Sequence, residues 1–186
     1  GYYLYITIQE GSGNQGHLYI VPISEVIAGF ITSSVYTTFG NVFVPYGLAL
    51  TTNYTWLVGT NGYVIKLNKN SHTYTSEVST SLFTNRWNAI SALDDTNVLV
   101  VGQNGLLMRK VNNSAFTLKS IIYNGGALTV ELTSVLMKSK TEWLVGTITG
   151  ELYATINSGN TWFLVADYNT CIADMYQASK NVIYLV

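Results

Sequence analysis

The chain has 186 residues and a formal net charge of −1, and only 10% of its residues are charged, against about 25% in a typical soluble domain. Apolar residues reach 48%, with 14 Tyr and 4 Trp, which excludes intrinsic disorder because there is ample material for a core. Nine Lys and Arg are balanced by ten Asp and Glu, so no surface that follows a phosphate backbone is expected, and nucleic acid is not a predicted partner. The length suits one domain or one part of a larger protein.

No segment predicts a membrane span, because no apolar run approaches the roughly 18–20 residues that a spanning helix needs. The chain begins at Gly1 without a recognisable signal peptide, and we expect a processed form or a segment of a longer protein. Cys171 is the single cysteine, so no disulfide within the chain is predicted.

Scarce charge together with abundant Thr, Asn, Ser and Tyr predicts an extracellular location or one on the surface of a particle. Two acceptor sequences for N-glycosylation are present, Asn53-Tyr54-Thr55 and Asn112-Asn113-Ser114. A chain this rich in Asn and Thr carries about one or two such sequences by chance. Asn53 and Asn112 are therefore candidate sites only.

The first predicted element is a hairpin. Aromatic and β-branched residues run through 3–8, glycines lie in the following loop, and a second apolar run covers 16–20. The loop 11–16 is similar to a phosphate-binding Gly-rich loop, but it lacks the Lys-Ser/Thr pair and the helix that follow such loops, so a hairpin tip is predicted. Tyr3 and Tyr5 share one strand face, where packing between sheets is expected and a sugar- or protein-binding surface is the alternative.

The next segment, 24–32, is almost continuously apolar. Periodicity alone does not separate a short helix from a buried strand at this length. We predict that it forms the outer part of the first sheet.

Three later hairpins share one pattern, at 56–62, 99–105 and 143–150: an apolar run ends in a glycine, and a short turn ends in a second glycine. Another apolar run follows each of them. The first glycines are Gly59, Gly102 and Gly146, and the second are Gly62, Gly105 and Gly150. The Asn-Gly pairs in the first two copies are strong turn signals, because tight hairpins need positive φ at central positions.

Further strands are predicted on both sides of each hairpin. An apolar strand precedes it, at 47–51, 89–93 and 134–138, and a polar outer strand follows it, at 73–79, 115–120 and 162–166. The second glycine of each hairpin recurs at positions 16, 62, 105 and 150, with spacings of 46, 43 and 45 residues. A repeated helix pair shares this period, but glycines and β-branched residues argue against it.

A four-stranded sheet cannot bury both of its faces alone, so the copies must stack on one another. Radial stacking of units with this period predicts an all-β fold, a β-propeller of four-stranded antiparallel blades. About four blades are expected, with hairpins near 3–20, 56–67, 98–111 and 143–156, and residues 171–186 form an unfinished copy.

The ends of the chain leave the domain organisation open. Residues 171–178 and 181–186 fit the first two strands of a blade, whereas the chain begins in a second-strand segment. Residues 1–186 are therefore either a single propeller domain, closed by pairing of the C-terminal strands with the first blade, or part of a larger propeller. A third alternative is strand pairing between subunits, because an open sheet edge invites association.

Residues 155–162 read Thr-Ile-Asn-Ser-Gly-Asn-Thr-Trp and resemble an Asp-box, the Ser/Thr-x-Asp-x-Gly-x-Thr-Trp pattern of sialidase-like (BNR-type) propellers. Asn157 stands where Asp is usual. With the glycine-bounded hairpins, the repeats over about residues 1–170 are similar to the propellers of photosystem II assembly factors. Segments 68–74 and 112–117 occupy equivalent positions but lack the glycine and the tryptophan. The resemblance implies an architecture rather than one activity.

Elementary chemistry gives the same residues structural roles. A short Asn157 side chain accepts backbone N–H groups inside a turn. Gly159 adopts the left-handed conformation that a β-carbon disfavours. Trp162 supplies a large apolar plate against the neighbouring blade.

No catalytic, metal-binding or cofactor-binding residue is predicted. A sialidase needs three arginines for the substrate carboxylate, whereas the chain has only Arg86 and Arg109. His17 and His72 are expected in solvated turns or polar segments, and with one cysteine they cannot supply a zinc site. Asp94-Asp95 is predicted to be a turn between two strands.

The predicted function is that of a non-enzymatic structural or binding module of a surface or particle, such as a spike, adhesin, coat or decoration protein. Other protein subunits are the expected partners, self-association and carbohydrate are further candidates, and Tyr side chains suit both kinds of contact. One alternative is a sialidase-like carbohydrate-active enzyme, because the ten carboxylates leave room for an acid pair. Another is an assembly or stability factor for a larger complex, as the resemblance implies.

Overall fold

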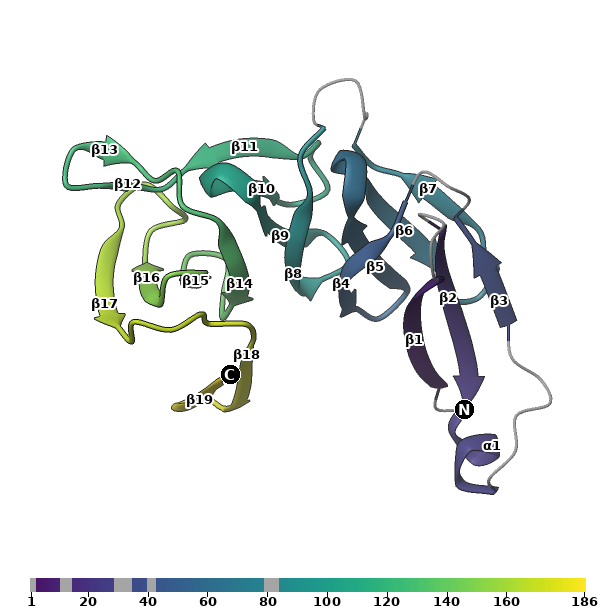
Figure 1. Ribbon diagram of the computed structural model, residues 1–186. Helices are drawn as coiled ribbons and strands as arrows, with labels where there is room; N and C mark the ends of the chain where they lie inside the picture. The colour runs from purple at the N-terminus through teal and green to yellow at the C-terminus, as the bar shows by residue number, and fades with distance from the viewer. Residues whose placement is uncertain (1–2, 11–14, 29–34, 40–42, 79–83) are drawn as a thin grey trace. The chain divides into compact units, whose positions relative to one another are not determined.

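A computed structural model describes residues 3–10, 15–28, 35–39, 43–78 and 84–186 (Figure 1). The chain divides into two compact units, Gly1–Tyr46 and Gly47–Val186. Within these described ranges, no helix has the length and apolar character needed to cross a membrane.

The first unit holds a three-stranded antiparallel sheet in the order β1 (Tyr3–Glu10), β2 (Gln15–Pro22), β3 (Val35–Thr38). Pairing of β1 with β2 confirms the predicted hairpin, although the loop tip at 11–14 lies outside the described residues. The apolar segment after it forms a helix, α1 (Ile23–Ala28), and its last part falls outside the described residues. A short helix is one of the two conformations that the sequence left open here, but the prediction that the segment forms the outer part of the sheet is wrong for its described residues. Pro22 has no N–H to extend the ladder, and β3 supplies the outer strand instead.

The second unit holds three four-stranded antiparallel sheets in simple chain order. Sheet 1 consists of β4 (Pro45–Leu50), β5 (Tyr54–Gly59), β6 (Val64–Asn68) and β7 (Tyr74–Ser76). Sheet 2 consists of β8 (Trp87–Asp94), β9 (Asn97–Gly102), β10 (Leu106–Lys110) and β11 (Thr117–Ser120). Sheet 3 consists of β14 (Leu132–Met137), β15 (Trp143–Thr147), β16 (Glu151–Thr155) and β17 (Phe163–Asp167). These sheets are the predicted four-stranded blades.

Two smaller hairpins complete this unit. One, β12 (Ile122–Tyr123) with β13 (Gly126–Ala127), lies between sheets 2 and 3 in the chain. The other is sheet 4, formed by β18 (Met175–Ser179) and β19 (Val182–Leu185). Sheet 4 is the predicted unfinished copy.

Backbone crossings explain the second glycine of each hairpin. Gly62 and Gly105 have φ of 72° and 69°, and the asparagine before each is also left-handed. The segment that leads to the next sheet passes directly over these turns: the Gly62 N–H donates to Asn85 O at 2.9 Å, and a β-carbon on Gly105 would lie 2.0 Å from Leu128 O. Conformation and space both require glycine here.

Consecutive sheets pack face to face through apolar cores. The core between sheets 1 and 2 includes Trp56, Val58, Val64, Ile90, Val100 and Met108. The core between sheets 2 and 3 includes Leu99, Val101, Leu107, Val135, Trp143 and Tyr153. The first three strands of sheet 2 thus alternate between two neighbours, and the predicted stacked all-β architecture is confirmed.

The hairpin of sheet 3 is offset by one residue from the other two. In sheet 2, Leu107 lies two residues after the second glycine and pairs with Val101, the residue before the first glycine. In sheet 3, Leu152 lies two residues after the second glycine but pairs with Gly146, which is the first glycine itself. The turn of sheet 3 has one more residue between its glycines, so aligning Trp143 with Trp56 in the sequence does not align them in space. A shift of one residue moves every side chain to the other face. Trp56 consequently packs toward the following sheet and Trp143 toward the preceding one.

We predict that Trp162→Ala lowers the free energy of unfolding by about 3–5 kcal/mol, because a large core side chain is removed. Trp162 is only 8% exposed, joins the core between sheets 2 and 3, and lies 6.2 Å from the Trp143 ring. Its buried indole nitrogen has no hydrogen-bond partner among the described residues, so Trp162→Phe should lose much less. Urea denaturation followed by circular dichroism measures both variants, and a loss below about 1 kcal/mol for the alanine variant would refute this packing.

A second prediction compares two glycines. Gly105→Ala should cost about 2–4 kcal/mol, because the new β-carbon meets the backbone of the crossing segment and φ is positive. Gly126→Ala is the matched control, since no atom of the described part of the chain lies within 4 Å of a β-carbon there. Its expected change is below about 0.5 kcal/mol, and equal losses in the two variants would contradict the crossing as the cause.

Candidate functional site

The turn between β16 and β17 has a closed set of internal hydrogen bonds. Asn157 Oδ1 accepts the Thr161 N–H at 2.9 Å and the Thr155 hydroxyl at 3.0 Å, and the Gly159 N–H donates to Thr155 Oγ1 at 3.0 Å. Gly159 has φ of 78°, and a β-carbon on it would lie 2.8 Å from the Trp143 ring. These contacts agree with structural roles for Asn157, Gly159 and Trp162, which stay predictions.

The same turn contacts sheet 2 through Arg109. Its Nη1 donates to Ser158 O at 3.2 Å, and its guanidinium lies 5.6 Å from the Trp143 ring centroid. The other arginine, Arg86, pairs with Glu131 at 2.5 Å. The two arginines are thus held in separate contacts between sheets 2 and 3, and they do not converge on a shared site.

The histidines are placed differently from one another. His72 lies in the turn after β6 with φ of 56°, as predicted. His17 lies in β2 and is 5% exposed, so the prediction of a solvated turn is wrong for it. Its neighbour Leu18 is also buried, so both faces of this central strand are covered at this point, which composition could not reveal. Among the described residues, no three His, Cys, Asp or Glu side chains are grouped as metal ligands would be.

Asp94 stabilises the turn between β8 and β9. Its Oδ1 accepts the N–H groups of Thr96 at 2.8 Å and Asn97 at 2.9 Å. Burial opposes its ionisation, but these hydrogen bonds and those from the two side chains outweigh it, so the pKa of Asp94 is lowered from its usual value. This residue behaves as the predicted turn residue.

Asp95 ties sheet 2 to sheet 1, a role that the sequence did not indicate. It accepts the Thr51 hydroxyl, and its Oδ2 accepts the Asn53 side-chain amide at 2.6 Å. Burial again opposes ionisation, but hydrogen bonds from Thr51 and Asn53 outweigh it, with help from the charge of Lys66, and the pKa of Asp95 is lowered. The two aspartates have separate donors and do not form an acid pair.

The candidate glycosylation sites differ in accessibility. The Asn53 amide nitrogen is engaged by Asp95, and the hydroxyl-bearing Thr55 is fully buried. Asn112, Asn113 and Ser114 are exposed in a turn, where Asn112 Oδ1 accepts from Lys140 at 3.0 Å. Glycosylation of either site stays a prediction, and the geometry favours Asn112.

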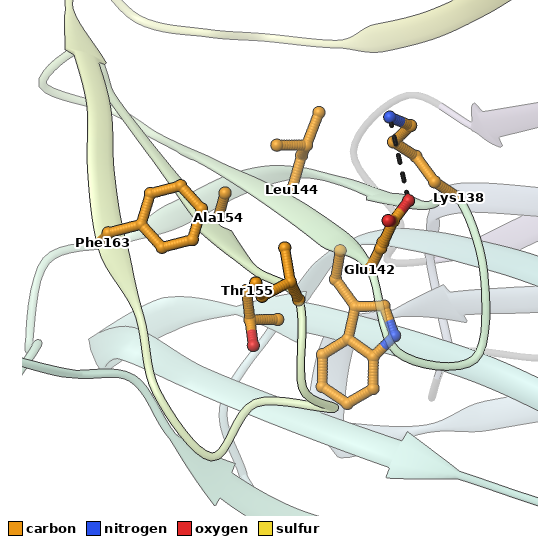
Figure 2. A pocket seen from close by; sticks show the side chains of 8 residues that line it. Lys138, Glu142, Leu144, Ala154, Thr155 and Phe163 are labelled. Atoms are coloured by element: carbon orange, nitrogen blue, oxygen red, sulfur yellow. Dashed lines mark ion pairs between the residues drawn. The ribbon is translucent and has the colours of Figure 1, made fainter. Parts of the chain in front are cut away.

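A groove lies on the face of sheet 3 that points away from sheet 2. Its floor is a row of cross-strand neighbours, Leu144, Ala154 and Phe163. Figure 2 shows Phe163 at one side and the Lys138–Glu142 ion pair, 4.0 Å long, at the other. The cavity measures about 200 Å³, and Trp143, Thr155 and Ile156 complete its lining.

The described strands of sheet 4 cover part of this face. Ile172 and Met175 pack on Leu152, with Leu136, Leu144 and Leu185 around them. A second cavity of about 260 Å³ lies at this junction, lined by Tyr168, Thr170, Cys171, Ile172, Leu185 and Val186. The single cysteine is exposed there.

The outer strand β17 exposes apolar side chains, which the sequence interpretation missed. Phe163, Leu164 and Val165 are 45%, 37% and 51% exposed, so the predicted polar outer strand is wrong in sheet 3. The signal was present in the sequence. Successive side chains of a strand point to opposite faces, so three consecutive apolar residues place apolar side chains on both faces of this outermost strand.

No family model and no curated protein matches the chain, but solved structures resemble its fold. "YCF48 from Cyanidioschyzon merolae" aligns over 68% of this chain at 19% identity with a TM-score of 0.59, and "YCF48 bound to D1 peptide" over 72% at 14% with 0.61. "RRP9 WD40 repeats" aligns over 98% at 10% identity with a TM-score of 0.59, covering 68% of that chain.

These similarities show a β-propeller-type fold. The chain spans 41% and 44% of the two YCF48 chains. The propeller part of the predicted resemblance is confirmed, and its Asp-box part stays a prediction.

The pH dependence of stability tests the Asp95 contact. Because the folded-state pKa of Asp95 is lowered, its contribution is complete above the unfolded-state value of about 4 and is lost as the pH falls through the folded-state value. Asp95→Asn should lower Tm at pH 7, and this difference from the original chain should shrink toward pH 3. Thermal scans at both pH values measure it, with the exposed Asp167→Asn as control. A difference that does not change with pH would rule out the charged contact.

Proposed function

We propose that the chain is a non-enzymatic β-propeller module that binds protein. One observation carries the proposal. Sheets 1 and 2 each bury the corresponding row of apolar side chains against the next sheet, whereas the row on sheet 3 lines an open groove in the described structure. Ten large hydrophobic side chains in the same part of the chain are more than a third exposed: Ile148, Ile156, Phe163, Leu164, Val165, Tyr168, Tyr176, Val182, Tyr184 and Val186. A concentration of exposed apolar surface is typical of protein contact sites.

The comparisons support a polypeptide ligand. One similar structure is described as bound to a D1 peptide, so a related propeller-type fold holds a peptide. The cavity on sheet 3, at about 200 Å³, is smaller than the roughly 300–1,000 Å³ of small-molecule sites. A few side chains of a protein partner suit it better than a whole ligand molecule.

The setting of this role is part of the proposal. Scarce charge and abundant Tyr, Thr and Asn suit a surface or particle, where other subunits or further copies of the chain would be the partners. The role of an assembly factor is the second candidate, and the peptide-bound neighbour favours it. A sialidase-like activity has less support, because Arg86 and Arg109 are engaged between sheets.

Selection from a random peptide library on the immobilised chain tests the function. We expect enrichment of peptides that bind the original chain and Leu118→Asp but bind Phe163→Asp more weakly, because only Phe163 lines the groove while both side chains are similarly exposed, at 48% and 45%. A glycan array and a glycoside panel complete the experiment. Hydrolysis or glycan binding without any peptide enrichment would overturn the proposal.

A further inference from the structure

We propose that Asn124 is a site of spontaneous covalent modification, at which the side-chain amide is lost and the residue becomes a mixture of aspartate and isoaspartate. The chain contains three Asn-Gly pairs, at 61–62, 104–105 and 124–125. The fold protects the first two and leaves the third open to reaction. This reaction is independent of the proposed protein-binding function.

The reaction needs only the Asn-Gly pair and water. The backbone nitrogen of the glycine attacks the side-chain carbonyl carbon, Cγ, of the asparagine. The proton of that nitrogen and the side-chain NH2 group leave together as ammonia, and a cyclic succinimide remains. Water then opens the ring at either carbonyl, which yields aspartate or isoaspartate. Glycine favours the attack because it has no side chain to obstruct its nitrogen, so access to the glycine nitrogen decides the rate.

Exposure of the asparagine does not separate the three pairs. The three asparagines are all exposed and have similar positive φ, in chain order 56°, 58° and 51°. The glycines differ, because Gly62 and Gly105 are buried whereas Gly125 is exposed. The difference therefore lies at the attacking group.

The crossing segments protect Gly62 and Gly105. The Gly62 N–H donates to Asn85 O at 2.9 Å, so the attacking nitrogen is already engaged. Gly105 lies against the backbone of Leu128, whose oxygen would be 2.0 Å from a β-carbon on this glycine. Each of these turns joins the two central strands of a four-stranded sheet. Opening of either turn would disturb packed sheets and requires a large part of the unfolding free energy.

The turn at Asn124-Gly125 is uncovered in the described structure. It joins β12 and β13, strands of two residues each that pair only with one another. Within the described part of the chain, no atom lies within 4 Å of a β-carbon built on Gly125 or Gly126. A two-stranded hairpin is marginally stable by itself, so this tip opens at a low free-energy cost.

Opening of the tip is what brings the reacting atoms together. Asn124 and Gly125 have φ of 51° and 79°, the pattern of a type I′ turn. For attack, the backbone of Asn124 must rotate about ψ until the Gly125 nitrogen approaches Cγ. Two consecutive glycines, Gly125 and Gly126, permit this rotation because neither carries a β-carbon.

The residues on both sides of the tip stay anchored. The Tyr123 ring lies 5.3 Å from the Tyr153 ring, and the Leu128 N–H donates to Ile121 O at 2.9 Å. Ile121 is fully buried in the core between sheets 2 and 3. Modification is thus confined to the exposed tip, and the product should be a folded chain with one more negative charge.

Incubation of the purified chain at mildly alkaline pH tests the assignment. Anion-exchange chromatography separates the more acidic product. Mass spectrometry of the peptide 120–138, released by cleavage after Lys and Arg, follows Asn124 as its only asparagine, and synthetic peptides with aspartate or isoaspartate in its place identify the products by retention. Asn124 should react at least about tenfold faster than Asn61 and Asn104, because a difference of about 1.4 kcal/mol in local opening gives this factor.

The same incubation in guanidinium chloride is the matched control. Without tertiary structure, the three pairs should react within about threefold of one another. A variant of the native chain gives a second control: Asn124→Gly removes the reacting amide and keeps a residue that accepts positive φ. It should form the acidic product at least about tenfold more slowly than the original chain, and circular dichroism confirms that it is folded.

Two results would overturn the assignment. One is a rate at Asn61 or Asn104 in the folded chain that equals the rate at Asn124, because the crossing segments would then give no protection. The other is an Asn124 that reacts in guanidinium chloride but not in the folded chain, because the hairpin would then protect it as well. Neither result bears on the proposed protein-binding function, which the peptide selection tests.

Discussion

Burial of one sheet's apolar face by the next sheet is the interaction on which the rest of the structure depends. A four-stranded sheet has two faces and hides neither by itself. Sheet 2 solves this by alternation: Val100 packs toward sheet 1 and Leu99 toward sheet 3. The glycine-bounded hairpins serve the same packing, because the connecting segment must pass over Gly105 at backbone contact distance.

Polar contacts set the alignment of the stacked sheets at their margins. Lys110, 4% exposed, pairs with Glu77 of the preceding sheet segment at 3.0 Å, and Arg86 pairs with Glu131. Asp95 contributes a third such tie toward Thr51 and Asn53. A buried lysine without its partner would be strongly unfavourable, so these pairs oppose sliding of one sheet over the next while the apolar faces supply the attraction.

The proposed site is a consequence of the same packing. Sheet 3 carries an outward face built like the one that sheet 2 buries, and the two described strands of sheet 4 cover part of it. The groove therefore has an apolar floor. The proposed binding function requires no unusual residue, because the lining of this groove is built from ordinary apolar side chains, Leu144, Ala154 and Phe163.

The sequence by itself determined the strands, the hairpin turns and the period, because alternation, glycine conformation and Asn-Gly turns act over a few residues. Tertiary structure decided the rest: the inward place of His17, the partner of Asp95, and the face on which Trp143 lies. One additional turn residue before Gly150 reverses that face, and its effect appears only when the strands pair. The apolar run of β17 was visible in the sequence, but the groove itself was beyond local patterns, because it depends on how the neighbouring sheet packs on Leu144 and Ala154, a long-range property.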